Sequence, residues 1–159
     1  MIISALEIKR LNINQSEELA NLLIDSKQKY SQYFIPFSFD LETISEVLSK
    51  AIKDQIYGIY VENNLVGFYM LRGFDGGYSI PSYGVWISEK YSNKGLSTFT
   101  LQHAISFCKL NSIGKIMLKV HPDNITAIHI YEKYGFKQTG IDPKIHHLIY
   151  HKELSENCK

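Results

Sequence analysis

The chain has 159 residues, a hydrophobic content of 45%, a charged content of 21% and a formal net charge of +1. These values are typical of one soluble globular domain with a packed core, here taken as residues 1–159. The near-neutral charge excludes the basic excess of most nucleic-acid-binding domains, and no apolar run reaches the length of a membrane span. We therefore expect neither a nucleic acid nor a membrane as partner.

The two cysteines, Cys108 and Cys158, show neither metal-ligand spacing nor a disulfide framework. Cys108 lies in an apolar helical pattern and is most simply a small core residue. The N-terminus lacks the features of a signal peptide, so a reducing cytoplasm is the expected compartment. The histidines share no spacing that indicates a metal, and we expect none.

The N-terminal third is predicted to contain one strand and two helices. Residues 2–10 alternate imperfectly between apolar and polar side chains and predict a strand. Asn14 and Glu17 form a capping-box pattern that opens a helix over roughly 15–27. A second amphipathic helix is expected over about 40–53.

From residue 56 onward, strands predominate and two further helices are expected. These elements are expected, along the chain, as strands at 56–61 and 65–71 joined by a turn at 62–64, a strand at 82–87, a helix over about 94–111, a strand at 115–120, a helix within 124–136, and two final strands, the second near 146–154. This order predicts a mixed α/β fold with a central antiparallel meander and about four helices, not a doubly wound sheet. The strands at 82–87 and 115–120 should be parallel neighbours joined by a right-handed crossover.

The helix within 124–136 has clear boundaries and one open face. Asn124 is a strong N-cap residue, and Gly135 ends the helix where the chain turns with φ > 0. Tyr131 follows Asn124 by seven residues, nearly two turns, so both side chains project from one face. Ala127 lies between them and leaves that face open to a ligand.

The loop before the long helix, residues 91–97, is an anion-site candidate. The first amides of a helix lack internal partners and carry the positive end of the dipole. Gly95 permits close approach of a phosphate, and Asn93 tolerates φ > 0. The alternative is an ordinary helix start capped by Ser92 or Asn93. The loop matches neither the dinucleotide fingerprint nor the Walker pattern.

Two segments together resemble the GNAT superfamily of N-acetyltransferases. Residues 121–136 match its Asn-x-x-Ala-x-x-x-Tyr-x-x-x-Gly-Phe pattern in full. Residues 86–97 resemble its acetyl-CoA pyrophosphate loop, usually Gln/Arg-x-x-Gly-x-Gly/Ala. Of that loop Gly95 is retained, whereas Ser92 stands where Gln or Arg is usual and Ser97 where Gly or Ala is usual. The expected strand order also fits this family along the whole chain.

The resemblance implies a GNAT-like sheet of about six to seven strands, in which the strands at 82–87 and 115–120 splay apart around the thioester. It implies acetyl-CoA (coenzyme A) as cofactor, with the pantetheine arm along the first of these strands and the pyrophosphate at the following loop. The cofactor-binding residues that it implies are Val85, Trp86, Ile87, Ser92, Asn93, Lys94, Gly95, Leu96, Ser97, Asn124, Ala127 and Tyr131.

It also implies direct attack of an amine on the thioester, without a covalent enzyme nucleophile. Tyr131 is the expected general acid for the departing thiolate, the alternative being an ordinary core tyrosine. A backbone N–H near Trp86 or Ile87 would stabilise the oxyanion. The general base is left open among Tyr83, His121, Asp75 and a water chain.

The acceptor site in such a fold is built by the segment between the first two helices and the loop at 72–81. Both are rich in aromatic residues, and the substrate-binding candidates are Tyr30, Tyr33, Phe34, Phe37, Phe74, Tyr78 and Tyr83. They would stack on the ring of an amino sugar or nucleotide-linked amino sugar; alternatively, the phenylalanines pack between sheet and helices. The absence of an acidic cluster disfavours a polyamine or an aminoglycoside.

We therefore expect an acetyl-CoA-dependent N-acetyltransferase acting on a primary amine of a small molecule. The runner-up acceptor is a protein N-terminus or lysine. A hypothesis of another class is a non-catalytic acyl-CoA-binding module. A homodimer is also allowed, through an edge strand at 146–154.

Overall fold

The computed structural model describes residues 1–24 and 36–155. Its strands are β1 (Leu6–Arg10), β2 (Gln55–Val61), β3 (Asn64–Arg72), β4 (Ser82–Ile87), β5 (Lys115–Val120), β6 (Lys137–Ile141) and β7 (Leu148–Glu153). Its helices are α1 (Ser16–Ile24), α3 (Leu41–Lys50), α4 (Leu96–Leu110) and α5 (Ile125–Lys133), with short 3₁₀ turns at Ile13–Gln15 and Glu89–Tyr91. Two compact units contain these elements: unit 1 is residues 1–70 and 85–97, and unit 2 is residues 71–84 and 98–159.

The strands form a mixed seven-stranded sheet in the order β1-β2-β3-β4-β5-β7-β6. The pair β4–β5 is parallel, whereas β1–β2, β5–β7 and β6–β7 are antiparallel. This arrangement confirms the expected fold class and the parallel crossover pair. One expectation is wrong: the last strand, β7, pairs on both sides, so β6 and not β7 is the edge strand.

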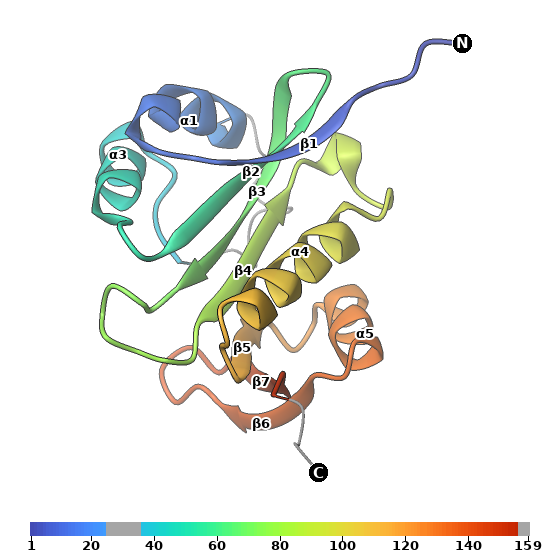
Figure 1. The fold of residues 1–159 in the computed structure, drawn as a ribbon. Helices are drawn as coiled ribbons and strands as arrows, with labels where there is room; N and C mark the ends of the chain where they lie inside the picture. The colour runs from blue at the N-terminus through green and yellow to red at the C-terminus, as the bar shows by residue number, and fades with distance from the viewer. Residues whose placement is uncertain (25–35, 156–159) are drawn as a thin grey trace. The chain divides into compact units, whose positions relative to one another are not determined.

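Unit 1 has a core between its strands and the pair α1 and α3, which lie side by side (Figure 1). Leu19 and Leu23 from α1, Ile44 from α3 and Phe68 from β3 are all at most 1% exposed. Asp40 caps α3, because its Oδ1 accepts a 2.8 Å hydrogen bond from the Thr43 amide. The apolar spacing that predicted this helix therefore marks its buried face.

The capping box of the first helix lies two residues earlier than expected. Asn12, not Asn14, has the extended backbone of a cap, and its Oδ1 accepts from the Asn14 amide at 2.9 Å. The Gln15 Oε1 accepts in return from the Asn12 amide at 2.8 Å. The predicted capping box of Asn14 and Glu17 is wrong because Asn14 lies inside the 3₁₀ turn that leads into α1. Of the predicted helix over 15–27, residues 25–27 fall outside the described chain.

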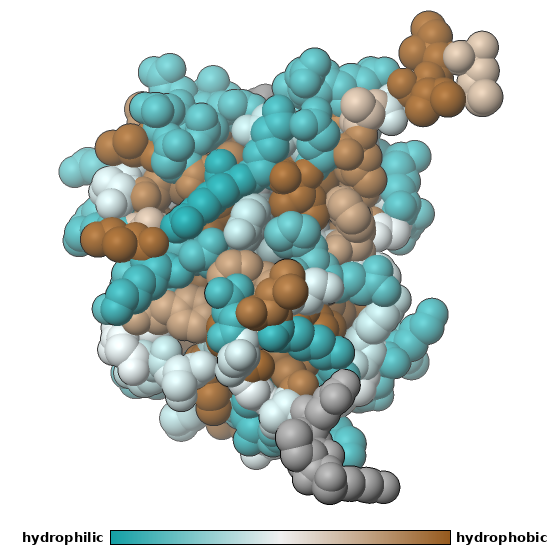
Figure 2. Space-filling view, viewed as in Figure 1, coloured by the Kyte–Doolittle hydropathy of each residue, from teal (hydrophilic) through white to brown (hydrophobic). Residues whose placement is uncertain are grey.

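The first strand is shorter than predicted because its partner ends. Val61 of β2 pairs with Leu6, and the chain then turns at Glu62 and Asn63, which both have positive φ. Ile2 and Ile3 therefore have no partner strand in β2 and are 92% and 80% exposed. Figure 2 shows this hydrophobic N-terminal end projecting from the surface. The turn at 62–64 is confirmed.

Unit 2 contains the second half of the sheet together with most of α4 and all of α5. Buried side chains such as Leu101 on α4, Ile116 on β5 and Phe136 after α5 make its core. The Tyr150 hydroxyl donates to Glu132 Oε1 at 3.0 Å and ties β7 to α5. Cys108 is fully buried, as predicted, and burial raises the pKa of its thiol to about 11. None of the described helices combines the length and the apolar character needed to cross a bilayer.

Candidate functional site

The boundaries of α5 are those that its sequence predicts. The Asn124 Oδ1 accepts from the Ala127 amide at 3.4 Å, and Gly135 has a φ of +88°. The amides of Tyr134 and Phe136 both donate to the Tyr131 carbonyl oxygen, at 3.2 and 3.0 Å. The backbone of Tyr131 is thus fixed by the turn that ends the helix.

The ring of Tyr131 is held by two other aromatic rings of unit 2. Tyr83, from the start of β4, packs edge-on at a centroid distance of 6.4 Å and an interplanar angle of 84°. Phe136 packs at 5.9 Å and 58°. Among the described residues, the Tyr131 hydroxyl has no hydrogen-bond partner, although burial raises the pKa of this phenol well above its usual value. The hydroxyl is therefore protonated at neutral pH and, as far as the described residues go, available to donate a proton.

Tyr83, a candidate base, has its hydroxyl engaged. The Tyr83 and Thr100 hydroxyl oxygens are 2.8 Å apart, and the two side chains are 4% and 0% exposed. Thr100 lies on α4 and has no place in the sequence motifs. Sequence reasoning missed it because a buried helical threonine gives no signal until the sheet brings β4 beneath α4.

The other two base candidates occupy different environments. His121 directly follows β5, and its Nδ1 accepts from the Asp123 amide at 3.0 Å. Its ring packs edge-on against His147 at 5.3 Å, because Val120 and Leu148 are paired in the β5–β7 register. Asp75 is exposed in the turn after β3. The role of each as a base stays a prediction.

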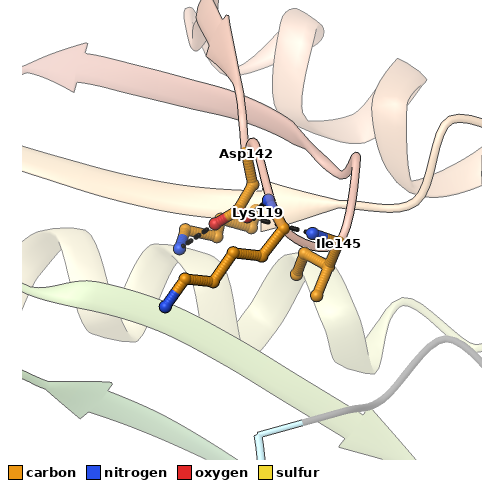
Figure 3. Close-up of polar contacts among 4 residues, drawn as sticks. Lys119, Asp142 and Ile145 are labelled. Carbon is orange, nitrogen blue, oxygen red and sulfur yellow. Dashed lines mark hydrogen bonds and ion pairs between the residues drawn. The ribbon is translucent and has the colours of Figure 1, made fainter.

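His147 belongs to a polar cluster that sequence spacing does not reveal. It is 7% exposed, and its pKa is lowered by burial first and then by the neighbouring charges of His121 and Lys119, against the opposing effect of Asp142. The Asp142 carboxylate accepts from Lys119 Nζ at 2.7 Å and from the Lys144 and Ile145 amides at 2.8 and 3.1 Å (Figure 3). These hydrogen bonds hold the pKa of Asp142 well below its usual range and fix the β6–β7 connection to β5.

The loop before α4 has the backbone of an anion site. Asn93 and Gly95 have φ values of +59° and +80°, which confirms the expected left-handed conformation at Asn93. Within the described chain, the amides of Asn93, Lys94 and Gly95 donate to no acceptor. Ser92 does not cap α4 through its side chain; its hydroxyl donates to the Glu89 carbonyl oxygen at 2.7 Å.

This loop is held at one end by a buried leucine, and the space beside its glycine is open. Leu96, the first residue of α4, is buried against Ile59, Val66 and Ile87 of unit 1. A Cβ added at Gly95 would meet no atom within 4 Å, so the space beside the loop is free. Three unengaged amides beside open space at a helix start are suited to a phosphate.

Residues 85–87 of β4 belong to unit 1, where Trp86 and Ile87 are buried and Val85 is partly buried. Trp86 is 5% exposed, and its ring stacks on Phe68 at a centroid distance of 6.4 Å. Ile87 packs with Ile59, Val66 and Leu96 in a second apolar cluster of unit 1. Val85 packs against this cluster. The parallel register with β5 is described only for Ser82 and Tyr83, at the opposite end of the strand.

The predicted aromatic acceptor wall is only partly described. Tyr30, Tyr33 and Phe34 lie outside the described residues. Phe37 packs on Phe68 at 6.2 Å, so it contributes to the core of unit 1, the alternative weighed for it.

The two aromatic residues of the β3–β4 connection lie in unit 2. Tyr78 is 71% exposed. Phe74 borders an open depression beside Ile80, Ser112 and Lys115. Phe74 is the one predicted substrate-binding residue in its lining, and none of the predicted catalytic or cofactor-binding residues lies there.

Known proteins match this chain along most of its length. The model of the Acetyltransferase (GNAT) family matches residues 18–136. Streptothricin acetyltransferase A of Bacillus subtilis (strain 168) is 28% identical over 122 residues, 76% of this chain and 69% of that protein. Spermine/spermidine N(1)-acetyltransferase of the same strain is 34% identical over 96 residues, 52% of this chain and 59% of that protein.

A solved structure matches the fold. RimL, a ribosomal L7/L12 alpha-N-protein acetyltransferase in complex with coenzyme A, has a TM-score of 0.79 at 16% identity, covering 94% of both chains. These matches confirm the expected fold and the family resemblance.

Proposed function

The chain belongs to the acetyltransferase (GNAT) family, a family of acyltransferases whose donor is acetyl-CoA, and on that premise we propose that it acetylates a primary amine of a small molecule, with Tyr131 as the general acid. The observation that carries the proposal is the state of Tyr131. Its ring is fixed by Tyr83 and Phe136, and its protonated hydroxyl is left without a partner in the described chain.

The loop before α4 fits the pyrophosphate of coenzyme A. Its amides at Asn93, Lys94 and Gly95 are unengaged, and the space beside Gly95 is open. Backbone donors suffice for such a contact, so the serine at position 92 does not remove the site. We assign the pyrophosphate to residues 93–97 and the pantetheine arm to the backbone of Val85, Trp86 and Ile87.

Acetyl-CoA, when bound, supplies a thioester whose carbonyl carbon the acceptor nitrogen attacks directly. Tyr131 would supply the proton that the departing sulfur takes up when the C–S bond breaks. A raised pKa keeps this phenol protonated, and desolvation of the sulfur raises the proton affinity of the thiolate in the same way. A backbone amide of β4 near Trp86 or Ile87 stabilises the charge that develops on the carbonyl oxygen.

The acceptor nitrogen must lose a proton. His121 is the base candidate whose ring has a second imidazole, His147, beside it. Burial and nearby positive charge lower the pKa of His147, so that it is neutral at pH 7. Tyr83 is the weaker candidate because its hydroxyl is engaged by Thr100.

For the acceptor we favour an amino sugar or a nucleotide-linked amino sugar over a polypeptide. The exposed ring of Tyr78 offers a stacking surface, whereas Phe37 belongs to the core. The relatives act, by their names, on streptothricin and on spermine or spermidine, and RimL on a ribosomal protein N-terminus. A protein N-terminus or lysine is therefore the second candidate, and spermidine belongs in any test although the sequence disfavours it.

The proposal is tested by incubating the protein with acetyl-CoA and a panel of amines and following free thiol. The panel contains glucosamine, a nucleotide-linked amino sugar, streptothricin, spermidine, an amino acid and a peptide with a free N-terminal serine. We expect turnover on one of the small amines, with the acetylated product confirmed by mass spectrometry. Turnover on the peptide alone would favour the second candidate.

The same assay separates an enzyme from a non-catalytic acyl-CoA-binding module. Tight coenzyme A binding in calorimetry, with no thiol release on any amine, would indicate the module. Absence of coenzyme A binding would contradict the assignment of the loop before α4.

A further inference from the structure

We propose that Thr100 is a positioning residue for acyl transfer, acting through Tyr83 to hold the ring of Tyr131. The inference rests on the proposed function, since it takes Tyr131 as the proton donor. All three residues belong to unit 2, and one hydrogen bond and one ring contact link them in series.

The first step is the hydrogen bond between α4 and β4. The Thr100 hydroxyl lies 2.8 Å from the Tyr83 hydroxyl, and Thr100 is completely buried. A valine would fill almost the same volume, so packing alone does not call for the hydroxyl. What the hydroxyl adds is a fixed position for the far end of the Tyr83 side chain.

The second step is the aromatic contact between Tyr83 and Tyr131. Since no described residue bonds the Tyr131 hydroxyl, the position of its oxygen depends on how the ring is packed. The packing partners of its ring are Tyr83, edge-on at 6.4 Å, and Phe136. Phe136 is fixed by its backbone bond to the Tyr131 carbonyl oxygen, whereas Tyr83 is anchored at its tip by Thr100.

Movement of the Tyr131 ring should change the rate of acyl transfer and not the binding of acetyl-CoA. Misplacement of a reacting group by about 1 Å can cost about 100-fold in rate. Tyr83 contacts the proton donor and Thr100 contacts Tyr83, and neither belongs to the loop that we assign to the pyrophosphate. A loosened Tyr83 ring should therefore lower kcat and leave the affinity for coenzyme A unchanged.

Three variants test the bond: Thr100→Val, Tyr83→Phe and the double variant. Each is assayed with acetyl-CoA and with glucosamine, the nucleotide-linked amino sugar, streptothricin or spermidine, whichever turns over fastest. We expect each single variant to lower kcat about tenfold, with the KM for acetyl-CoA unchanged within about twofold. Thr100→Ser keeps the hydroxyl and should recover most of kcat. Cys108→Ala, also fully buried on α4, is the matched control for loss of core packing.

The double variant separates positioning from stability. Removing one partner leaves a buried hydroxyl with one bond fewer, whereas removing both is close to neutral for stability. We expect the double variant to unfold at a higher temperature than either single variant while its kcat stays low. Recovery of kcat together with stability would show a purely structural role and overturn the proposal.

Tyr131→Phe shows whether the effect passes through Tyr131. In that background Thr100→Val should lower kcat no further, because the donor is already absent. If Tyr131→Phe is slow but Thr100→Val has wild-type kcat, the inference about Thr100 fails alone. If Tyr131→Phe has wild-type kcat, the proposed acid is wrong and the inference falls with it.

A second readout needs no acceptor. In protein labelled with ¹³C at the tyrosine Cζ, the Tyr131 resonance is assigned by its loss in Tyr131→Phe. We expect Thr100→Val to shift this resonance and Cys108→Ala to leave it in place. An unshifted Tyr131 signal in Thr100→Val would overturn the proposal.

Discussion

Gly67 is the position at which a single added methyl group should disturb β4 most. An ideal Cβ there would lie 2.7 Å from the Trp86 carbonyl oxygen, 2.9 Å from Ile87 Cδ1 and 3.2 Å from Ile87 Cα. Two of these three atoms are backbone, and they cannot rotate away as the end of a side chain can. Gly67→Ala must therefore push β3 and β4 apart locally.

The size of the effect follows from the overlap. The contact with the carbonyl oxygen is about 0.7 Å shorter than ordinary van der Waals contact, and overpacking of this kind costs about 1–3 kcal/mol. For a chain of this length each 1 kcal/mol lowers Tm by about 2–4 °C, so we expect a fall of about 2–12 °C. Coenzyme A binding should weaken as well, because Trp86 and Ile87 are the residues that we assign to the pantetheine arm.

The assay is thermal unfolding followed by circular dichroism, together with calorimetric titration of coenzyme A. Gly140→Ala is the matched control, since its added Cβ would meet nothing closer than Ile149 Cδ1 at 3.9 Å. Gly58→Ala should lie between them, because the atoms it meets, of Leu65, Leu11 and Tyr60, all belong to side chains. Equal Tm values for Gly67→Ala and Gly140→Ala would refute the reasoning.

Three further predictions concern single sites. Gly95→Ala imposes a side chain on a φ of +80°, which costs about 1–2 kcal/mol in the left-handed region, and should weaken coenzyme A binding in calorimetry, whereas Asn93→Gly should not. Asp142 has a lowered pKa in the folded state, so its contribution to stability is fully present above the unfolded pKa and is lost as the pH falls through the folded value; Asp142→Asn should therefore lower Tm more at pH 7 than at pH 2, and an equal loss at both would contradict the carboxylate bonds. Cys108, with a thiol pKa of about 11 and no exposure, should react with a thiol reagent at pH 8 only after denaturation, measured in a Cys158→Ser background; rapid reaction in the native protein would contradict its burial.

Turn, loop and capping residues made the ends of several helices and strands predictable. Strands β4 and β5 begin and end at the predicted residues, because turn and loop residues bound short β-rich runs. The Asn124 cap and the Gly135 stop are also as predicted. At the N-terminus the pattern predicts Asn14 as the cap, and it does not encode the 3₁₀ turn that makes Asn12 the cap instead.

Contacts between distant segments were not predictable in the same way. The Thr100–Tyr83 bond joins residues 17 apart and exists only once α4 covers β4. The His121–His147 pair depends on the β5–β7 register, and the position of β7 inside the sheet depends on strand order. No local periodicity records these pairings, so the motif indicated Tyr131 but not the residues that hold it.

The central claim is tested most directly by the kcat of Tyr131→Phe on the best amine of the panel, measured beside its affinity for coenzyme A. Phenylalanine keeps the ring contacts with Tyr83 and Phe136 and removes only the hydroxyl. We predict a fall in kcat of about 100- to 10,000-fold, the usual contribution of a general acid, with coenzyme A affinity unchanged within about twofold. A variant that turns over as fast as the wild type would contradict the account.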